Sequence, residues 1–252
     1  METSPAKAYA QIDAGEEERN AADNHDERTE ELHNAMENAH AAYNAALEAI
    51  PRAEIKIQPE TKLTRQNISN MPEIRYTGIT SRFNADRITA FVVIDTETTG
   101  LRAASDRIVE LSAILYEDFQ PLKAWSTLIN PGKHIDERST DIHHITDEMV
   151  ADAPTLAGVA EDFKAFVGSC PIMGYNLPFD LKFLWASGID LADGKRRYYD
   201  MLETARARYK DCSDYKLGTL CNYLGIWRTD AHRSLSDCYA TACCFLKLIG
   251  KF

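Results

Sequence analysis

The chain has 252 residues, of which 44% are hydrophobic and 27% charged, and its formal net charge is −11. This composition is typical of a folded globular protein and excludes a chain that is disordered throughout. No run of about 18 apolar residues occurs, so the sequence predicts no membrane span, and its polar N-terminus predicts no secretion signal. We therefore expect a cytoplasmic protein with no membrane partner, whose six cysteines are reduced.

The negative charge is concentrated in the first part of the chain. Residues 1–50 hold 12 acidic and 3 basic side chains, whereas the rest of the chain holds 27 and 25. A nearly neutral body argues against a protein that coats nucleic acid through a general positive field. It remains compatible with a metal-dependent nuclease, because bound divalent cations invert the charge of a local carboxylate cluster.

Residues 1–60 are predicted to form an acidic, alanine-rich extension that is partly disordered and partly helical. Residues 1–26 are too polar to form a core. Apolar residues at spacings of three and four then predict an amphipathic helix from about Glu30 to Ile50, which Pro51 stops. Its apolar stripe can pack on the body or bind a partner, and both interpretations stay open. Residues 61–89 are predicted to be a linker.

Residues 90–252 alternate strand and helix patterns, which predicts one α/β domain with a mixed sheet. Residues 91–95 form a β-branched run typical of a buried central strand, and residues 107–117 and 122–130 alternate like a pair of strands. The later patterns predict, in order, a helix near 156–167, a strand at 170–176, a helix at 179–187, a strand and a helix within 198–210, and helices at 216–226 and 234–249.

Acidic side chains stand at the ends of three of these elements. Asp95 and Glu97 leave the first strand two residues apart, which places both carboxylates on one face. Asp180 lies at or near the N-cap of the helix that follows the short strand, and Asp237 lies in the first turn of the last helix. Each alone is compatible with a solvated turn or a helix cap. Together with His232, they predict one site in which cations offset like charges.

The order of these motifs resembles the DEDDh 3′–5′ exonucleases, also called the DnaQ-like family. Three motifs carry the likeness, namely DTE at 95–97, NLPFD at 176–180 and HRSLSD at 232–237. It covers about residues 90–250 and is closest to the proofreading (epsilon) exonuclease subunit or domain of bacterial DNA polymerase III. The resemblance implies a ribonuclease H-like fold, in which helices flank a mixed sheet.

By this resemblance, Asp95, Glu97, Asp180 and Asp237 are metal-binding catalytic carboxylates and His232 is the general base. The implied cofactors are two divalent cations, Mg²⁺ or Mn²⁺, which prefer hard oxygen ligands. The residues that match the family's contacts to the terminal nucleotide are Thr98, Leu101, His143, Asn176 and Phe179.

At two positions the match to the family leaves an alternative open. Phe179 can press against a base or pack in the core, and both interpretations stay open. His144 stands where the family usually has glycine, which leaves the local geometry of the substrate groove open.

The resemblance implies a metal-dependent 3′–5′ exonuclease that releases nucleoside 5′-monophosphates from single-stranded DNA, in replication proofreading or repair. An exoribonuclease of the ribonuclease T or oligoribonuclease type stays open, because no motif reports on the 2′-hydroxyl. A non-catalytic nucleic-acid-binding scaffold is disfavoured, since all five catalytic positions are present. The expected partners are a nucleic acid 3′ end, DNA before RNA, and a DNA polymerase or other protein bound through the N-terminal helix.

Overall fold

The computed structural model describes residues 30, 33–59, 63–80, 83–192, 194, 196–228 and 232–252. The chain divides into two units, Met1–Tyr43 and Asn44–Phe252, and the second unit contains the whole sheet. Residue 30 and residues 33–48 are helical, in agreement with the helix predicted there. The disorder expected for residues 1–26 lies outside the described residues.

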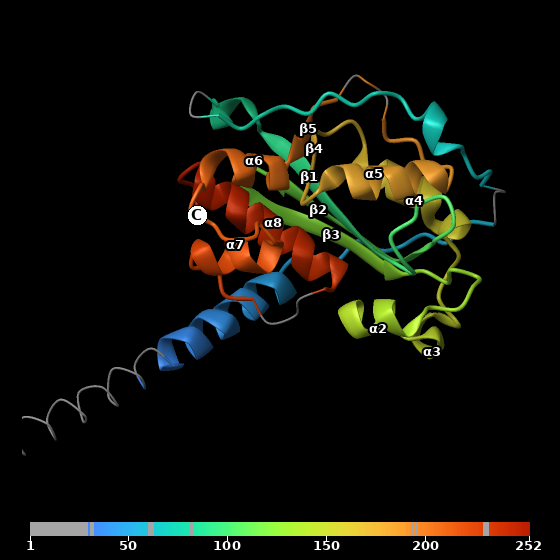
Figure 1. Cartoon of the computed structure of the whole chain (residues 1–252), viewed down its shortest axis with the longest axis horizontal. Coiled ribbons are helices and arrows are strands. Elements are labelled where there is room, and N and C mark those ends of the chain that lie inside the picture. The colour runs from blue at the N-terminus through green and yellow to red at the C-terminus, as the bar shows by residue number, and fades with distance from the viewer. Residues whose placement is uncertain are drawn as a thin grey trace, which may run out of the picture. The chain divides into compact units, whose positions relative to one another are not determined.

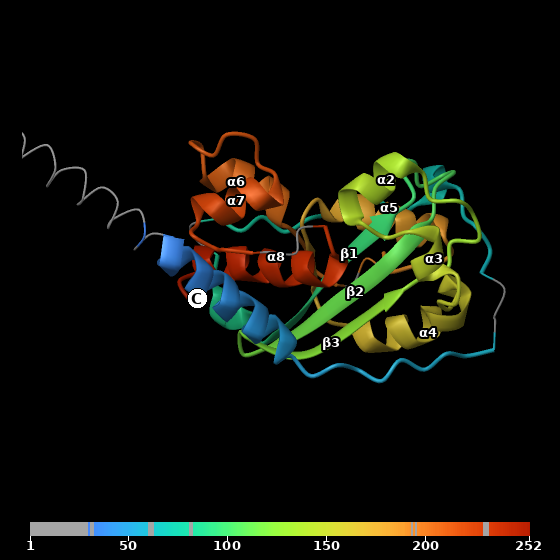
Figure 2. The same ribbon diagram turned by 90° about the horizontal axis from the view of Figure 1, so that it is seen from below.

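Five strands form one mixed sheet in the order β3-β2-β1-β4-β5. Their bounds are β1 Ala90–Thr98, β2 Ile108–Glu117, β3 Gln120–Leu128, β4 Ile172–Gly174 and β5 Tyr198–Asp200. β1, β2 and β3 are antiparallel neighbours, which Figure 2 shows following one another across the sheet, whereas β4 and β5 run parallel to β1. Asp118 and Phe119, both with positive φ, make the tight turn of the predicted β2–β3 hairpin.

The helices of the second unit alternate with these strands and flank the sheet. Their bounds are α2 Glu137–His143, α3 Asp147–Val150, α4 Leu156–Val167, α5 Leu177–Ala186, α6 Met201–Arg208, α7 Leu217–Tyr223 and α8 Ser234–Leu248, with 3-10 turns η1 Ile68–Asn70 and η2 Ala85–Arg87. The sequence patterns did not predict α2 and α3. Both helices are too short to show a period, but Asp136 and Thr146 cap them with the side-chain bonds typical of helix starts.

Helices cover both faces of the sheet (Figure 1), and successive residues of β1 point to opposite faces. Val92 and Ile94 are fully buried in a core cluster that includes Phe163 of α4 and Leu181 of α5. On the other face, the Phe91 ring packs edge-on against Phe245 of α8, with ring centroids 5.3 Å apart. Because helices cover both faces, the apolar run that predicted a central strand lies in the middle of the sheet. The expected mixed sheet flanked by helices is therefore confirmed.

Residues 44–89 belong to the same unit as the sheet. The backbone N–H of Ala53 donates to Ala124 of β3 at 2.7 Å, and that of Thr77 donates to Tyr198 of β5 at 2.7 Å. Since β3 and β5 are the two outer strands, this segment protects both sheet edges from pairing with another chain. Among the described residues, no helix has the length and apolarity needed to cross a membrane.

Candidate active site

The C-terminal half of β1 carries two acidic residues on the face covered by α8. Asp95 and Glu97 are alternate residues of the strand, so their side chains point to the same side. Their register partners on β2 are Ser112 and Glu110. Both β1 carboxylates are half-buried, although residues 91–94 before them are buried. The end of a rigid strand therefore fixes both groups at the border between core and solvent.

Asp237 reaches this pair from α8. It lies in the first turn of that helix, as predicted, and its side chain is almost entirely buried. One carboxylate oxygen from each of Asp95, Glu97 and Asp237 lies within 4.8 Å of the others. Three oxygen donors at this spacing can share a divalent cation. The structure thus brings together three of the four predicted carboxylates as a candidate metal site.

Asp180 lies beside this group but is oriented differently. It is buried in the first turn of α5, and its Oδ1 accepts a hydrogen bond of 2.7 Å from the Thr96 hydroxyl. Asn176 is the N-cap of α5, with a left-handed backbone (φ 61°), and Asp180 lies four residues later in the first turn, near the cap as predicted. Asp180 therefore does not cap α5, and Thr96 positions its carboxyl next to the β1 acids.

Burial and mutual repulsion make the cluster unfavourable without added positive charge. Burial raises the pKa of the Asp95 carboxyl, and the nearby charges of Asp180 and Asp237 raise it further. Burial also raises the pKa of Glu97 to about 8, with smaller contributions from Asp237 and Glu110. The pKa of Asp180 is raised to about 7 by burial, against the opposing effect of its hydrogen bond from Thr96. The ionised cluster therefore favours a bound cation.

Arg228 supplies one positive charge to this region. Its Nη1 donates to Oδ1 of Asp237 at 2.7 Å, and both side chains are close to fully buried. The pKa of Asp237 is raised by burial, and the charge of Arg228 opposes that rise. The structure thus places Arg228 on a candidate metal ligand, where its charge offsets part of the carboxylate's.

Glu110, the register partner of Glu97, is neutralised by the chain itself. Arg233 donates to it from Nη2 at 2.6 Å and from Nε at 3.1 Å, and the backbone N–H of Ser234 donates at 2.8 Å. The Ser234 hydroxyl also lies 2.6 Å from that of Ser112 on β2. These bonds fix the first residues of α8 to β2, and thereby the position of Asp237 three residues later in the same turn.

His232 stands immediately before this fixed helix start. Its backbone has φ 61° and its side chain is exposed. It is close enough to Asp237 for its positive charge to oppose the rise in the pKa of that carboxyl. The predicted general base is therefore next to the acidic cluster and open to solvent.

Two cavities border the cluster and divide the predicted substrate residues between them. The substrate cavity, as we call the first, has a volume of about 610 Å³, and its walls include Glu97, Thr98, Leu101, His143 and Phe179. The second has a volume of about 790 Å³, and its walls include Asn176, Arg228, His232 and Asp237. Each cavity thus exposes one carboxylate of the candidate metal site.

The predicted nucleotide-contacting residues differ in how they meet the substrate cavity. Leu101 is 83% exposed at its rim, which is unusual for a leucine and leaves its side chain available to a base. Phe179 both lines the cavity and packs against Phe183, with ring centroids 4.7 Å apart. His143 lines the cavity as a buried side chain, and its Nδ1 accepts a hydrogen bond of 3.0 Å from the Ile145 backbone N–H.

His144 has a structural explanation. It ends α2 with a left-handed backbone (φ 59°), a conformation that glycine adopts most easily. Its side chain is exposed and is not part of the substrate cavity. The departure from the family's usual glycine therefore affects the end of a helix rather than the floor of the groove.

Thr96, Glu110 and Arg228 are site residues that the sequence analysis did not identify. Thr96 and Glu110 lie on strands read as apolar or alternating, and the pairing of Glu110 with Glu97 depends on strand register. The sequence shows Glu110 within a strand pattern, but its position opposite Glu97 follows only from the register of the β1–β2 pair.

Comparisons with known proteins show the family of the chain. The model of the exonuclease family (RNase T) matches residues 92–245. DNA polymerase III PolC-type of Oceanobacillus iheyensis is 35% identical over 163 residues, which are 64% of this chain and 11% of that protein. The corresponding protein of Thermotoga petrophila is 34% identical over 211 residues, 82% of this chain and 15% of that protein. The chain thus spans less than one fifth of the length of these relatives.

Two solved structures share the fold. The zinc-bound complex of E. coli exonuclease I with single-stranded DNA has a TM-score of 0.56 and 22% identity, covering 64% of this chain and 40% of that one. Exonuclease X in complex with 5′-overhanging duplex DNA has a TM-score of 0.51 and 26% identity, covering 64% and 91%. The chain therefore belongs to the exonuclease family, as a DnaQ-like 3′–5′ exonuclease with a ribonuclease H-like fold.

Proposed function

We propose that this exonuclease hydrolyses the 3′-terminal phosphodiester of single-stranded DNA and releases nucleoside 5′-monophosphates. The observation that carries the proposal is the convergence of Asp95, Glu97 and Asp237 within 4.8 Å, next to the exposed His232. A phosphodiester is anionic, so its attack by water needs local positive charge and a group that accepts the water's proton.

The donor set suits two divalent cations, Mg²⁺ or Mn²⁺. All its donors are carboxylate oxygens, which these hard cations prefer. The raised pKa values of Glu97 and Asp180 mean that their ionised forms are unfavourable without added positive charge, which a bound cation would supply. When bound, such cations activate water and neutralise charge on the phosphate and the leaving oxygen. Asp95, Glu97, Asp180 and Asp237 are the residues that would hold them.

His232 is proposed to accept the proton of the attacking water on an imidazole nitrogen. Histidine is the side chain most often used for this task near neutral pH. Its exposed position beside the fixed start of α8 allows the ring to approach a substrate while Asp237 stays in place.

The substrate cavity is proposed to hold the terminal nucleotide. Leu101 would press on the base from the exposed rim, with Phe179 on the inner wall. Thr98 and His143 line the same cavity, and Asn176 would meet the nucleotide from the neighbouring one. Leu101→Ala is expected to raise KM several-fold without lowering thermal stability, because the side chain is already exposed.

DNA is preferred as the substrate because the relatives are DNA polymerase III proteins and the two structural neighbours are bound to DNA. The same relatives support a role in replication proofreading or repair. A protein partner bound through the helix at residues 33–48 is part of this proposal, and a binding assay with a replicative polymerase, with and without residues 1–43, would test it.

The decisive experiment uses 5′-labelled single-stranded DNA and RNA of one sequence, incubated with the full chain and either Mg²⁺ or EDTA. We expect stepwise shortening of the DNA from its 3′ end, only with Mg²⁺. Faster shortening of the RNA would identify an exoribonuclease. Binding without shortening of either strand would identify a non-catalytic scaffold and contradict the proposal.

A further inference from the structure

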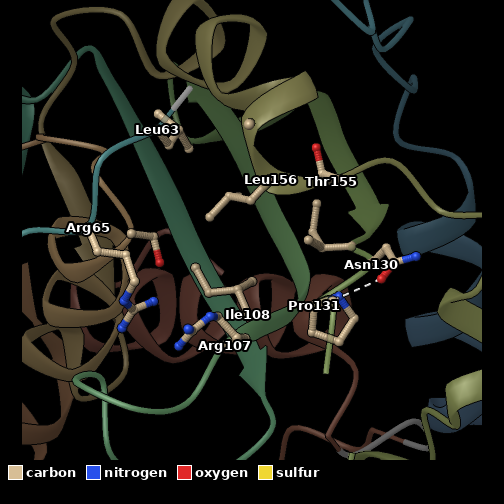
Figure 3. Close-up of a pocket in the computed structure, with 12 residues that line it drawn as sticks. Leu63, Arg65, Arg107, Ile108, Asn130, Pro131, Thr155 and Leu156 are labelled. Atoms are coloured by element: carbon tan, nitrogen blue, oxygen red, sulfur yellow. Dashed lines mark hydrogen bonds between the residues drawn. The ribbon is translucent and has the colours of Figure 1, made fainter. Parts of the chain in front are cut away.

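The loop of residues 99–107 borders a further cavity besides the substrate cavity. This cavity has a volume of about 420 Å³, within the range of small-ligand sites. Figure 3 shows that Leu63, Ile108 and Leu156 give it an aliphatic wall, while Arg65 and Arg107 bring their guanidinium groups to one side. We call it the arginine pocket. None of its residues belongs to the predicted catalytic set.

One wall of the arginine pocket comes from a segment outside the matched family region. The backbone N–H of Gln66 donates to Ala186 at 3.2 Å, and the Trp185 indole donates to Asn67 at 3.1 Å. Gly188, with φ +92°, allows the same segment to approach closely, since a Cβ there would lie 2.8 Å from the Thr64 carbonyl oxygen. The wall is therefore held in place by the end of α5.

The two arginines are anchored to one loop without a carboxylate partner. Nη2 of Arg65 donates to Ala103 at 2.6 Å, and Nη1 of Arg107 donates to Ser105 at 2.8 Å, in both cases to the backbone carbonyl. Burial lowers the pKa of Arg65, and the charge of Arg107 lowers it further. Within the described ranges, no carboxylate forms an ion pair with either guanidinium.

The nearest acidic residue in sequence is turned elsewhere. Asp106 accepts a hydrogen bond from the Arg102 backbone N–H at 2.8 Å and pairs with Lys133 at 3.3 Å. Two neighbouring cations, held by backbone carbonyls and facing a cavity, are suited to an anion with several acceptor oxygens. Guanidinium groups bind phosphate in this way.

We propose that the arginine pocket binds a nucleoside monophosphate, with its phosphate at Arg65 and Arg107 and its sugar and base against the aliphatic wall. The polar side chains of Asn130 and Thr155 make hydrogen bonds within the chain, so the aliphatic wall would hold the base. The choice of nucleotide rests on the proposed function, because that reaction releases this compound; the phosphate site rests on the pocket alone.

The pocket is connected to the substrate cavity through backbone hydrogen bonds. The Thr99 N–H donates to the Arg107 carbonyl at 2.8 Å, and the Arg107 N–H donates to the Thr99 hydroxyl at 3.1 Å. Thr99 lines the substrate cavity. A nucleotide in the arginine pocket would therefore contact a residue that is hydrogen-bonded to the wall of the substrate cavity.

Isothermal titration of the full chain with deoxyadenosine 5′-monophosphate in EDTA tests this inference. Without cations the acidic cluster repels phosphate, so the titration reports on the arginine pocket. We expect saturable binding of one nucleotide per chain, at least about tenfold tighter than that of inorganic phosphate or adenosine. Absence of saturable binding would overturn the inference, and equal affinity for phosphate would overturn the nucleotide as the ligand.

Two variants locate the binding. Leu156→Trp fills the pocket without changing its charge, and Arg107→Gln removes one cation; each should weaken binding at least about tenfold. Arg75→Gln, which changes an exposed arginine of the neighbouring segment, should bind like the parent. Circular dichroism checks the fold, and Leu156→Trp decides alone if Arg107→Gln does not fold. Parent-like affinity in a folded Leu156→Trp chain would overturn the inference.

Nuclease assays on the same proteins separate the two proposals. Hydrolysis of DNA by a chain that shows no nucleotide binding in EDTA would overturn only the arginine pocket. Binding that Leu156→Trp abolishes, in a chain that hydrolyses neither DNA nor RNA, would overturn only the proposed function.

Discussion

Two glutamates face each other across the β1–β2 ladder, and the chain treats their charges in opposite ways. Glu110 receives hydrogen bonds from Arg233 and from the Ser234 backbone, so its charge is neutralised within the protein. Glu97 is grouped instead with Asp95 and Asp237, two further carboxylates. The same residue type at paired positions of one hairpin thus meets an arginine on β2 and two further carboxylates on β1.

The contrast shows which negative charges the fold leaves for an external cation. Arg228 offsets part of the charge at Asp237, but Asp95, Glu97 and Asp180 have no arginine or lysine within ion-pair distance among the described residues. Buried like charges without counterions destabilise a fold. Their presence at one strand end is therefore better explained by a bound ligand than by stability.

Asp95→Asn removes one carboxylate of the acidic group on β1 and should have the largest effect on activity. The amide keeps the shape of the side chain but removes the charge that a cation needs. We expect Mg²⁺-dependent hydrolysis to fall by more than about 10³-fold, and calorimetry to show weakened Mn²⁺ binding. An Asp95→Asn protein with parent activity would contradict the assignment of Asp95 as a metal ligand.

His232→Ala tests the proposed general base, which lies next to Asp237 and immediately before the start of α8. If His232 is the general base, kcat should fall by about 10²–10⁴-fold with little change in KM. Mn²⁺ binding should be unchanged, because the side chain is exposed and outside the acidic group. Loss of Mn²⁺ binding in this variant would make His232 a ligand instead of the base.

Glu110→Gln removes the carboxylate that pairs with Arg233 on β2, and we expect a smaller effect on activity. The amide loses the ion pair with Arg233 and holds the start of α8 less firmly. Since Arg233 is 42% exposed, the free energy of unfolding should drop by only about 1–3 kcal/mol in chemical denaturation. Loss of positioning should lower kcat about tenfold without changing KM.

A double-mutant cycle separates positioning from general destabilisation. If Glu110 acts by positioning His232, Glu110→Gln should cost little further activity in the His232→Ala background. Equal losses of kcat in both backgrounds would mean that Glu110 acts on the site as a whole. Glu161→Gln, which removes an exposed glutamate of α4, serves as the matched control.

The sequence predicted the parts of the site that local patterns encode. Strand alternation placed Asp95 and Glu97 on one face, and the helix start placed Asp237 in a first turn. The start of α5 was predicted at residue 179, whereas Asn176, with its left-handed backbone, caps the helix and Asp180 lies in its first turn. The role of Glu110 could not be predicted, since it depends on hairpin register and on an arginine 123 residues away.

The stability of the cation-free protein should depend on pH through the acidic group on β1. Glu97 and Asp180 have pKa values raised to about 8 and about 7 in the fold, above their ordinary values of 4.5 and 3.8. At pH values between the ordinary and the raised pKa of each carboxyl, the folded state binds more protons than the unfolded state. Without cations, stability should therefore fall as pH rises from about 4 to about 8.

A bound cation replaces those protons, so its stabilising effect should grow over the same range. In thermal unfolding, we expect the increase in Tm from Mn²⁺ over EDTA to be larger at pH 8 than at pH 5. Glu97→Gln should reduce that dependence, whereas Glu110→Gln should retain it, because Glu110 already has a cation supplied by the chain. Equal stabilisation at both pH values would place the Mn²⁺ away from this cluster, and the two glutamates would then differ in structure without differing in function.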